Sequence, residues 1–145
     1  MLIQEISFNI IQNIKKKYNT SFEVAAIRYS KFNPGKCCFI VADFINPEFC
    51  NHKIINKLYA VKVRYAISSK HFPTYIAQDR LIAKDSLTYG LFFESWSNKR
   101  TIAREIPISD FGSSKKFTCN AEVKAIGNKV AYILLWLPEQ EYRLL

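Results

Sequence analysis

The sequence predicts an α+β domain in which two N-terminal helices precede a mostly antiparallel sheet with flanking helices. The first observation is an apolar residue at every third or fourth position over residues 2–18, the period of an amphipathic helix. The second is the alternation of residues 58–67, which is typical of a half-buried strand. The third is the closing hairpin, in which residues 117–125 and 129–137 flank a Gly-Asn turn.

The two helices are expected in the first third of the chain. The last turn of the first helix carries Lys15, Lys16 and Lys17, where cations interact favourably with the negative end of the helix dipole. The second helix is expected to begin at a capping box, in which Thr20 and Glu23 each satisfy a free backbone N–H. The apolar stripe of the first helix is Ile3, Ile6, Ile10, Ile14 and Tyr18. The second helix continues through Val24, Ala25, Ile27, Arg28 and Phe32 and ends at the turn Asn33-Pro34-Gly35.

The rest of the chain is expected to form the sheet and one short helix. Asp85 or Ser86 can cap a helix that contains Leu87, Leu91 and Phe92. The last strand, residues 130–137, barely alternates, so it should be central and covered on both faces. The other expected segments are a strand at 36–42, a loop at 43–56, irregular structure at 68–83 and a strand at 101–108. In the alternating strand, one face is expected to hold Tyr59, Val61, Val63, Tyr65 and Ile67.

Length and composition exclude several classes of protein. A chain of 145 residues fits one domain with at most a small appendage, and 49% apolar and 14% aromatic residues exclude intrinsic disorder. No apolar run approaches the ~18–20 residues that a bilayer span requires. Polar residues such as Glu5, Ser7 and Asn9 interrupt any secretion signal, so we expect a cytoplasmic protein with no membrane partner.

The net charge of +9 raises the question of nucleic-acid binding. The basic residues are spread along the chain, whereas nucleic-acid binders often carry a dense basic stripe. A reading helix usually offers Arg, Lys, Asn or Gln near its N-terminus, but the second helix begins with Ser21, Phe22 and Glu23. DNA is therefore an alternative partner that the charge pattern does not favour. Its candidate contacts are Lys15, Lys16, Lys17 and Arg28.

The sequence lacks the common signatures of catalysis, cofactor binding and metal binding. The four glycines are too dispersed for a P-loop or a dinucleotide fingerprint, and no H-E-x-x-H or G-x-S-x-G motif occurs. Cys50-x-His52 lacks a second ligand pair at zinc spacing, so no metal and no cofactor are expected. We expect four free thiols, mostly buried, with Cys37 and Cys38 on opposite faces of a strand. A dyad of Cys50 or Cys119 with His52 or His71 stays open, but only residue type supports it.

Aromatic and polar side chains concentrate between residues 64 and 96. Ligand pockets are commonly apolar and aromatic with a few placed polar groups, so this stretch is a candidate pocket wall. The alternative interpretation is that these aromatic residues fill a core beneath a long loop. The candidate pocket residues are Arg64, Ser68, His71, Tyr75, Tyr89 and Trp96.

Residues 21–29, which read SFEVAAIRY, resemble a short helix that follows the peptidase module in ImmA/IrrE-type proteins. The likeness continues in the Cys-containing apolar strand at 37–41 and in SSKHFPTYI at 68–76. Asp85-Ser86 and ILLWL at 133–137 also fit. The resemblance implies an N-terminal zinc peptidase, a helix-turn-helix-like middle and a GAF-like C-terminal domain that senses a signal. In that family the peptidase cleaves or inactivates a repressor and so switches on stress or mobile-element genes.

This chain lacks the H-E-x-x-H motif and its downstream acidic ligand, so zinc and proteolysis cannot be carried over. The resemblance implies a helix-turn-helix-like pair at 1–33 and a GAF-like sensory or interaction domain at 36–145. The first hypothesis is therefore a non-catalytic regulatory module whose partners are a small-molecule signal and a repressor or peptidase. The second is a nucleic-acid-binding module that uses the helix pair. An unrecognised enzyme ranks third.

Overall fold

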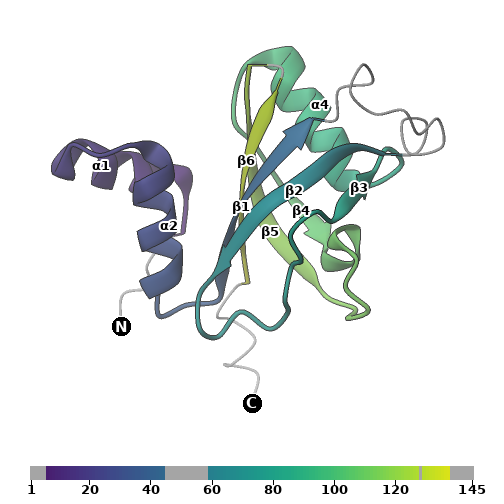
Figure 1. The fold of residues 1–145 in the computed structure, drawn as a ribbon, viewed down its shortest axis with the longest axis horizontal. Helices are drawn as coiled ribbons and strands as arrows, with labels where there is room; N and C mark the ends of the chain where they lie inside the picture. Colours follow the sequence, from purple (N-terminus) through teal and green to yellow (C-terminus); the bar gives the residue numbers. More distant parts are fainter. Residues whose placement is uncertain (1–5, 45–58, 128, 138–145) are drawn as a thin grey trace.

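The computed structural model describes residues 6–44, 59–127 and 129–137 and confirms the α+β class. These residues form three α-helices and a curled antiparallel sheet of six strands in the order β3-β2-β1-β6-β5-β4 (Figure 1). The helices are α1 (Phe8–Tyr18), α2 (Phe22–Phe32) and α4 (Leu87–Asn98), with a short 3-10 helix η1 (Ile108–Phe111). The strands are β1 (Cys37–Phe44), β2 (Tyr59–Ser68), β3 (Leu81–Ala83), β4 (Ile102–Pro107), β5 (Thr118–Ile126) and β6 (Val130–Trp136).

The strand β6 is central, as its weak alternation predicted. It pairs with β1 on one side and β5 on the other, and its side chains enter two separate cores. Ile133 and Leu135 pack with α4 and η1 on one face of the sheet, whereas Leu134 packs with α1 and α2 on the other. Apolar side chains are thus required on both faces of β6, and strict alternation is lost.

The alternating strand β2 contains a bulge that corrects the sequence interpretation. Val41 of β1 pairs with Tyr65, but the next residue, Ala42, pairs with Val63, so Arg64 is an extra residue. An extra residue shifts the side-chain period by one and exchanges the faces beyond it. Val63 therefore packs on the α4 side and Tyr65 on the α1–α2 side, although alternation predicted one shared face.

The start of α2 also differs from the expected capping box. The cap is Ser21, whose hydroxyl accepts a hydrogen bond from the backbone N–H of Val24 at 3.1 Å. Thr20 lies one residue outside the helix, and the carboxylate of Glu23 turns toward the sheet instead of the helix end. The phenols of Tyr65 and Tyr132 both interact with that carboxylate. Neither contact can be inferred from the periodicity of α2.

The described residues confirm some of the other predicted elements and correct others. The cap of α4 is Ser86, one of the two predicted candidates, and the strand at 101–108 and the pairing of the closing hairpin are confirmed. The segment expected to be irregular contains β3, and η1 was not predicted. The first helix begins at Phe8 among the described residues, with Ser7 as its cap. Residues 45–56 of the predicted loop lie outside the described residues, while Asp43 and Phe44 belong to β1.

Candidate interaction surface

The helix pair α1–α2 is packed against one face of the sheet, opposite to α4 (Figure 1). Ala25 and Ala26 of α2 are almost fully buried, and their small side chains allow close approach to the sheet. Four aromatic rings complete the contact: Phe22 stacks on Tyr132 at a centroid distance of 5.3 Å and meets Phe8 edge-on at 5.6 Å. Phe39 of β1 contacts both Phe22 and Tyr132. Edge-on and stacked pairs add specific geometry to the apolar burial.

A polar contact fixes the same interface. The hydroxyl of Tyr65 donates a hydrogen bond to Oε1 of Glu23, and the hydroxyl of Tyr132 approaches Oε2 at 3.4 Å. Burial and the Glu23 carboxylate both raise the pKa of Tyr65, and the same two causes raise that of Tyr132. The bulge at Arg64 makes this contact possible, because it turns Tyr65 toward α2. The helix pair is thereby held to the sheet by apolar, aromatic and charged contacts together.

On the side away from this interface, α1 and α2 form two adjoining hollows of about 540 and 410 Å³. We call them together the helix-pair groove. Four residues line both hollows and form the middle of the groove: Ile14, Arg28, Tyr29 and Phe32. One end is lined by Tyr18, Thr20, Val24 and Ala25, and the other by Ile10, Asn33 and Pro34.

The helix-pair groove exposes large apolar side chains. Phe32 is 75% exposed, Tyr18 66% and Val24 43%. Single exposed apolar residues are ordinary, but three at one groove between two packed helices form a concave apolar surface. Such a surface, rimmed by polar groups, is typical of a site that binds another molecule.

The charge around the groove has one sign. Between residues 8 and 32 the sequence holds five basic residues and one acidic residue. Arg28 is exposed in the middle of the groove, the ammonium of Lys17 lies 5.4 Å from the Tyr18 ring centroid, and that of Lys31 lies 5.7 Å from the Phe32 centroid. The single acid, Glu23, is bonded to phenols on the sheet. The groove is therefore apolar with a cationic rim.

The six candidate pocket residues occupy different places. None of them lines either hollow of the helix-pair groove. Arg64 is paired with Asp43, its Nε 3.0 Å from Oδ2, and the Ser68 hydroxyl donates to Sγ of Cys38 at 3.4 Å. His71 and Tyr75 are exposed in the connection between β2 and β3. Tyr89 is half-buried against the α4-side core, and Trp96 is 46% exposed beside Phe93.

The candidate nucleic-acid contacts are closer together. Lys15, Lys16 and Lys17 form the last turn of α1, and Arg28 lies in the groove beside it. The N-terminal end of α2, however, is engaged with the sheet through Phe22 and Glu23. A recognition helix needs that end free to meet base edges. Phe22 and Glu23 are thus turned toward the sheet and are not placed to meet base edges.

The described thiols are buried and lie on both faces of the sheet. Cys37, Cys38 and Cys119 are free, and burial raises their pKa values to about 11, 12 and 12. A thiol with so high a pKa stays protonated at neutral pH and is a poor nucleophile. This weakens the proposed dyad of Cys119 with His71, whose side chain is exposed. Cys50 and His52 lie outside the described residues.

Residues 6–44, 59–127 and 129–137 contain no group of three or more Cys, His, Asp or Glu side chains placed to hold a metal ion. None of the described helices is long and apolar enough to cross a membrane.

Sequence reasoning missed the helix-pair groove. Its signal is present in the spacing: Ile10, Ile14 and Tyr18 recur every four residues, and so do Val24, Arg28 and Phe32. Apolar residues at this spacing predict one buried stripe on each helix. In α1, however, the fully buried residue is Ile11, while Ile10, Ile14 and Tyr18 of the predicted stripe line the groove. Ile6 and Ile14 also pack against the core beneath the helix pair.

Comparisons with known proteins identify no family for this chain. No protein-family model matches the sequence, and a search of curated proteins returns no significant match.

Proposed function

We propose that this protein is a non-catalytic regulatory module that binds a partner protein in its helix-pair groove. The observation that carries the proposal is the exposure of Tyr18, Val24 and Phe32 along a groove whose two helices are fixed to the sheet. A groove between packed helices is largely pre-formed, so binding requires little ordering of the backbone. The sheet then serves as the scaffold that holds both helices in place.

The proposal includes the resemblance to ImmA/IrrE-type proteins, with a GAF-like domain after the helix pair. What supports this part is the order of the elements, in which two helices precede an antiparallel sheet that carries α4 on its far face. In a protein of that type the partner is a peptidase or a repressor. The module would act by occupying or releasing that partner. Its sensory function, with Arg64, Ser68, His71, Tyr75, Tyr89 and Trp96 as pocket residues, stays a prediction.

A partner protein fits the groove better than a nucleic acid. The floor is formed largely by apolar side chains, and Arg28 is the one charged residue among those that line the two hollows. Sites for single-stranded nucleic acids combine aromatic stacking platforms with a basic track along the backbone. Tyr18 and Phe32 beside Lys17 and Lys31 resemble such platforms, and this observation keeps nucleic-acid binding as the second candidate.

Photo-crosslinking in host cells tests the proposal. The photo-reactive residue benzoylphenylalanine replaces Phe32 in one variant and Tyr75 in the other. Both side chains are exposed, but Tyr75, in the β2–β3 connection, lines neither hollow of the groove. We expect a protein adduct at position 32 that is absent at position 75. Equal adducts at both positions, or an adduct with nucleic acid at position 32, would overturn the proposal.

A further inference from the structure

We infer that the occupant of the helix-pair groove is an amphipathic α-helix with an acidic polar face. This inference rests on the proposed function and names the chemical class of the partner. Three features lead to it: the shape of the groove, the placement of its large side chains and the sign of its charge.

The shape of the groove follows from helix geometry. Ile10, Ile14 and Tyr18 on α1 are four residues apart, as are Val24, Arg28 and Phe32 on α2. Four residues rise about 6 Å along a helix, so each row is about 12 Å long. Rows at this spacing form the ridges into which another helix packs its own side chains. Two such rows beside one groove favour a third helix over an extended peptide.

The large side chains divide the groove into places for apolar anchors. Ile14, Arg28 and Phe32 border both hollows. Each hollow can therefore accept its own side chain of the partner, one on each side of these three residues. A helix laid into a groove presents its anchors at positions i, i+3 or i+4, and i+7. The two hollows are therefore suited to large apolar residues that are one to two turns apart on the same helix.

The charge of the rim selects the polar face of that helix. Arg28 lies in the middle of the groove, and Lys17 and Lys31 lie beside its exposed aromatic rings. The only acid of the helix pair, Glu23, is held by Tyr65 and Tyr132 on the opposite side. Complementary charge speeds encounter and excludes partners of the same sign. Acidic residues beside the apolar anchors would meet this requirement.

The same charge argues against a second copy of this chain in the groove. Two helix-pair grooves facing each other would bring two sets of five basic residues together. Like charges across an interface oppose association. The observations thus favour a different chain as the occupant.

Direct binding to designed peptides tests the inference. The first probe is a fluorescein-labelled peptide of about 14 residues with apolar anchors at i, i+4, i+7 and i+11 and Glu at its polar positions. The second probe has Lys in place of every Glu, and the third has the composition of the first in scrambled order. Fluorescence anisotropy is measured with the whole protein. We expect the first probe to bind at least ~10-fold more tightly than the other two, with an affinity that falls as salt rises.

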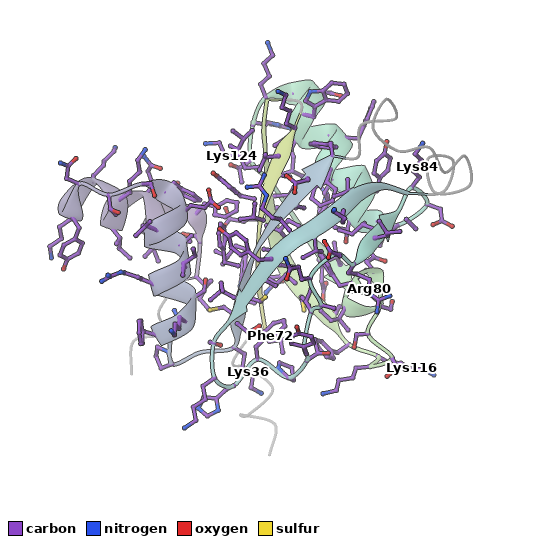
Figure 2. All side chains as sticks on the ribbon, in the orientation of Figure 1. Lys36, Phe72, Arg80, Lys84, Lys116 and Lys124 are labelled. Carbon is purple, nitrogen blue, oxygen red and sulfur yellow. The ribbon has the colours of Figure 1, made fainter. Side chains whose placement is uncertain are left out.

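Charge-reversal variants locate the binding. Arg28→Glu should weaken binding of the first probe at least ~10-fold, whereas Lys116→Glu should change it less than ~2-fold. Lys116 is an exposed lysine on the far side of the sheet from the helix pair (Figure 2). Because Arg28 is exposed, the variant should fold, and its circular dichroism and thermal unfolding establish this. Chemical-shift changes on binding should concentrate at Tyr18, Val24 and Phe32.

Other results overturn the inference. Equal binding of the acidic and basic probes, tighter binding of a single-stranded or duplex DNA oligonucleotide, or no effect of Arg28→Glu would each do so. So would the absence of binding by the acidic probe. If the position-32 crosslink nevertheless captures a protein, the proposed function stands and the partner is not an acidic helix. If that crosslink also fails, both proposals fall.

Discussion

The phenol of Tyr65 donates a hydrogen bond to the carboxylate of Glu23 and so ties the centre of β2 to the first turn of α2. The two residues are 42 positions apart in the sequence. Their contact depends on the extra residue Arg64, without which Tyr65 would face the other core. It also explains why the cationic helix pair has no acid at its groove, since its one carboxylate is used at the sheet.

Replacing this carboxylate should loosen the helix pair. Glu23→Gln keeps the shape of the side chain but removes the charge that Tyr65 and Tyr132 share. We expect the free energy of unfolding to fall by about 1–2 kcal/mol, since hydrogen bonds to charged groups are worth more than neutral ones. Urea denaturation measures the loss, and amide exchange should accelerate mainly in α1 and α2.

The control for this variant is Glu94→Gln. Glu94 lies 3.5 Å from Arg104 in an ion pair that is largely exposed, so its loss should cost less than about 0.5 kcal/mol. Equal losses in the two variants would show that the contact of Glu23 with the phenols adds no stability.

Stability should also decline at alkaline pH. Burial raises the pKa of Tyr29 to about 12 and that of Cys37 to about 11, from ordinary values of 10.0 and 9.0. A group whose pKa is raised in the folded state holds its proton more tightly there than in the unfolded chain. The unfolded state therefore gains stability once pH exceeds the ordinary pKa. Below pH 9 these groups contribute no pH dependence, and above it the free energy of unfolding should fall steadily. Urea titrations at intervals from pH 7 to about pH 10.5 test this, and a rising or constant value over that interval contradicts it.

The buried thiols should be unreactive in the folded protein. Cys50→Ser removes the one cysteine outside the described residues, which leaves Cys37, Cys38 and Cys119. These three side chains are fully buried and carry raised pKa values, so both access and thiolate formation are suppressed. We expect Ellman's reagent to label the native variant at least ~100-fold more slowly than the urea-unfolded one. Rapid labelling of any of the three in the native state would contradict their burial.

The sequence was most informative where local chemistry decides the structure. The pairing of the closing hairpin, a cap of α4 at Ser86 (one of two predicted candidates) and the central position of β6 all follow from short-range or composition rules and were predicted correctly. The faces to which the side chains of β2 point were not predicted correctly. The bulge that sets them depends on pairing with β1, which is distant in sequence. The three residues of β3 were also missed, since so short a strand is stabilised by its partner β2 and not by its own pattern.

The helix-pair groove could not be predicted either, because it also depends on packing between distant segments. An apolar residue on an amphipathic helix is assigned to the core by periodicity alone. Ile10 and Ile14 fit that pattern, yet Ile11 is the residue of this helix that reaches zero exposure. Which stripe is buried depends on how α1 is rotated against α2 and the sheet, where Phe8 of α1 meets Phe22 of α2 edge-on. The choice between core and groove is thus made by tertiary packing.

Two alanine variants distinguish the observed helix cap from the one that the sequence predicted. Ser21→Ala removes the oxygen that accepts from Val24 N–H at 3.1 Å, so it should lower the free energy of unfolding by about 1 kcal/mol. Thr20→Ala should change it by less than about 0.5 kcal/mol, because Thr20 is not the cap of α2. Thermal or urea unfolding of the two variants measures both changes. A larger loss of unfolding free energy for Thr20→Ala would support the capping box that the sequence predicted.

Two glycine positions should respond to alanine in opposite directions. Gly112, the C-cap of η1, has φ of 82°, and a Cβ there would also lie 2.3 Å from Cζ of Arg80. The guanidinium can swing away, but the left-handed backbone stays strained, so Gly112→Ala should cost about 1–2 kcal/mol. Gly90 lies in the exposed part of α4, where a Cβ would meet nothing within 4 Å. Alanine favours the helix over glycine by about 0.8–1.0 kcal/mol, so Gly90→Ala should stabilise the protein by up to that amount. Urea denaturation of both variants compares them directly. A neutral Gly112→Ala would mean that the turn after η1 tolerates another conformation, whereas a destabilising Gly90→Ala would place an unrecognised contact on the outer face of α4.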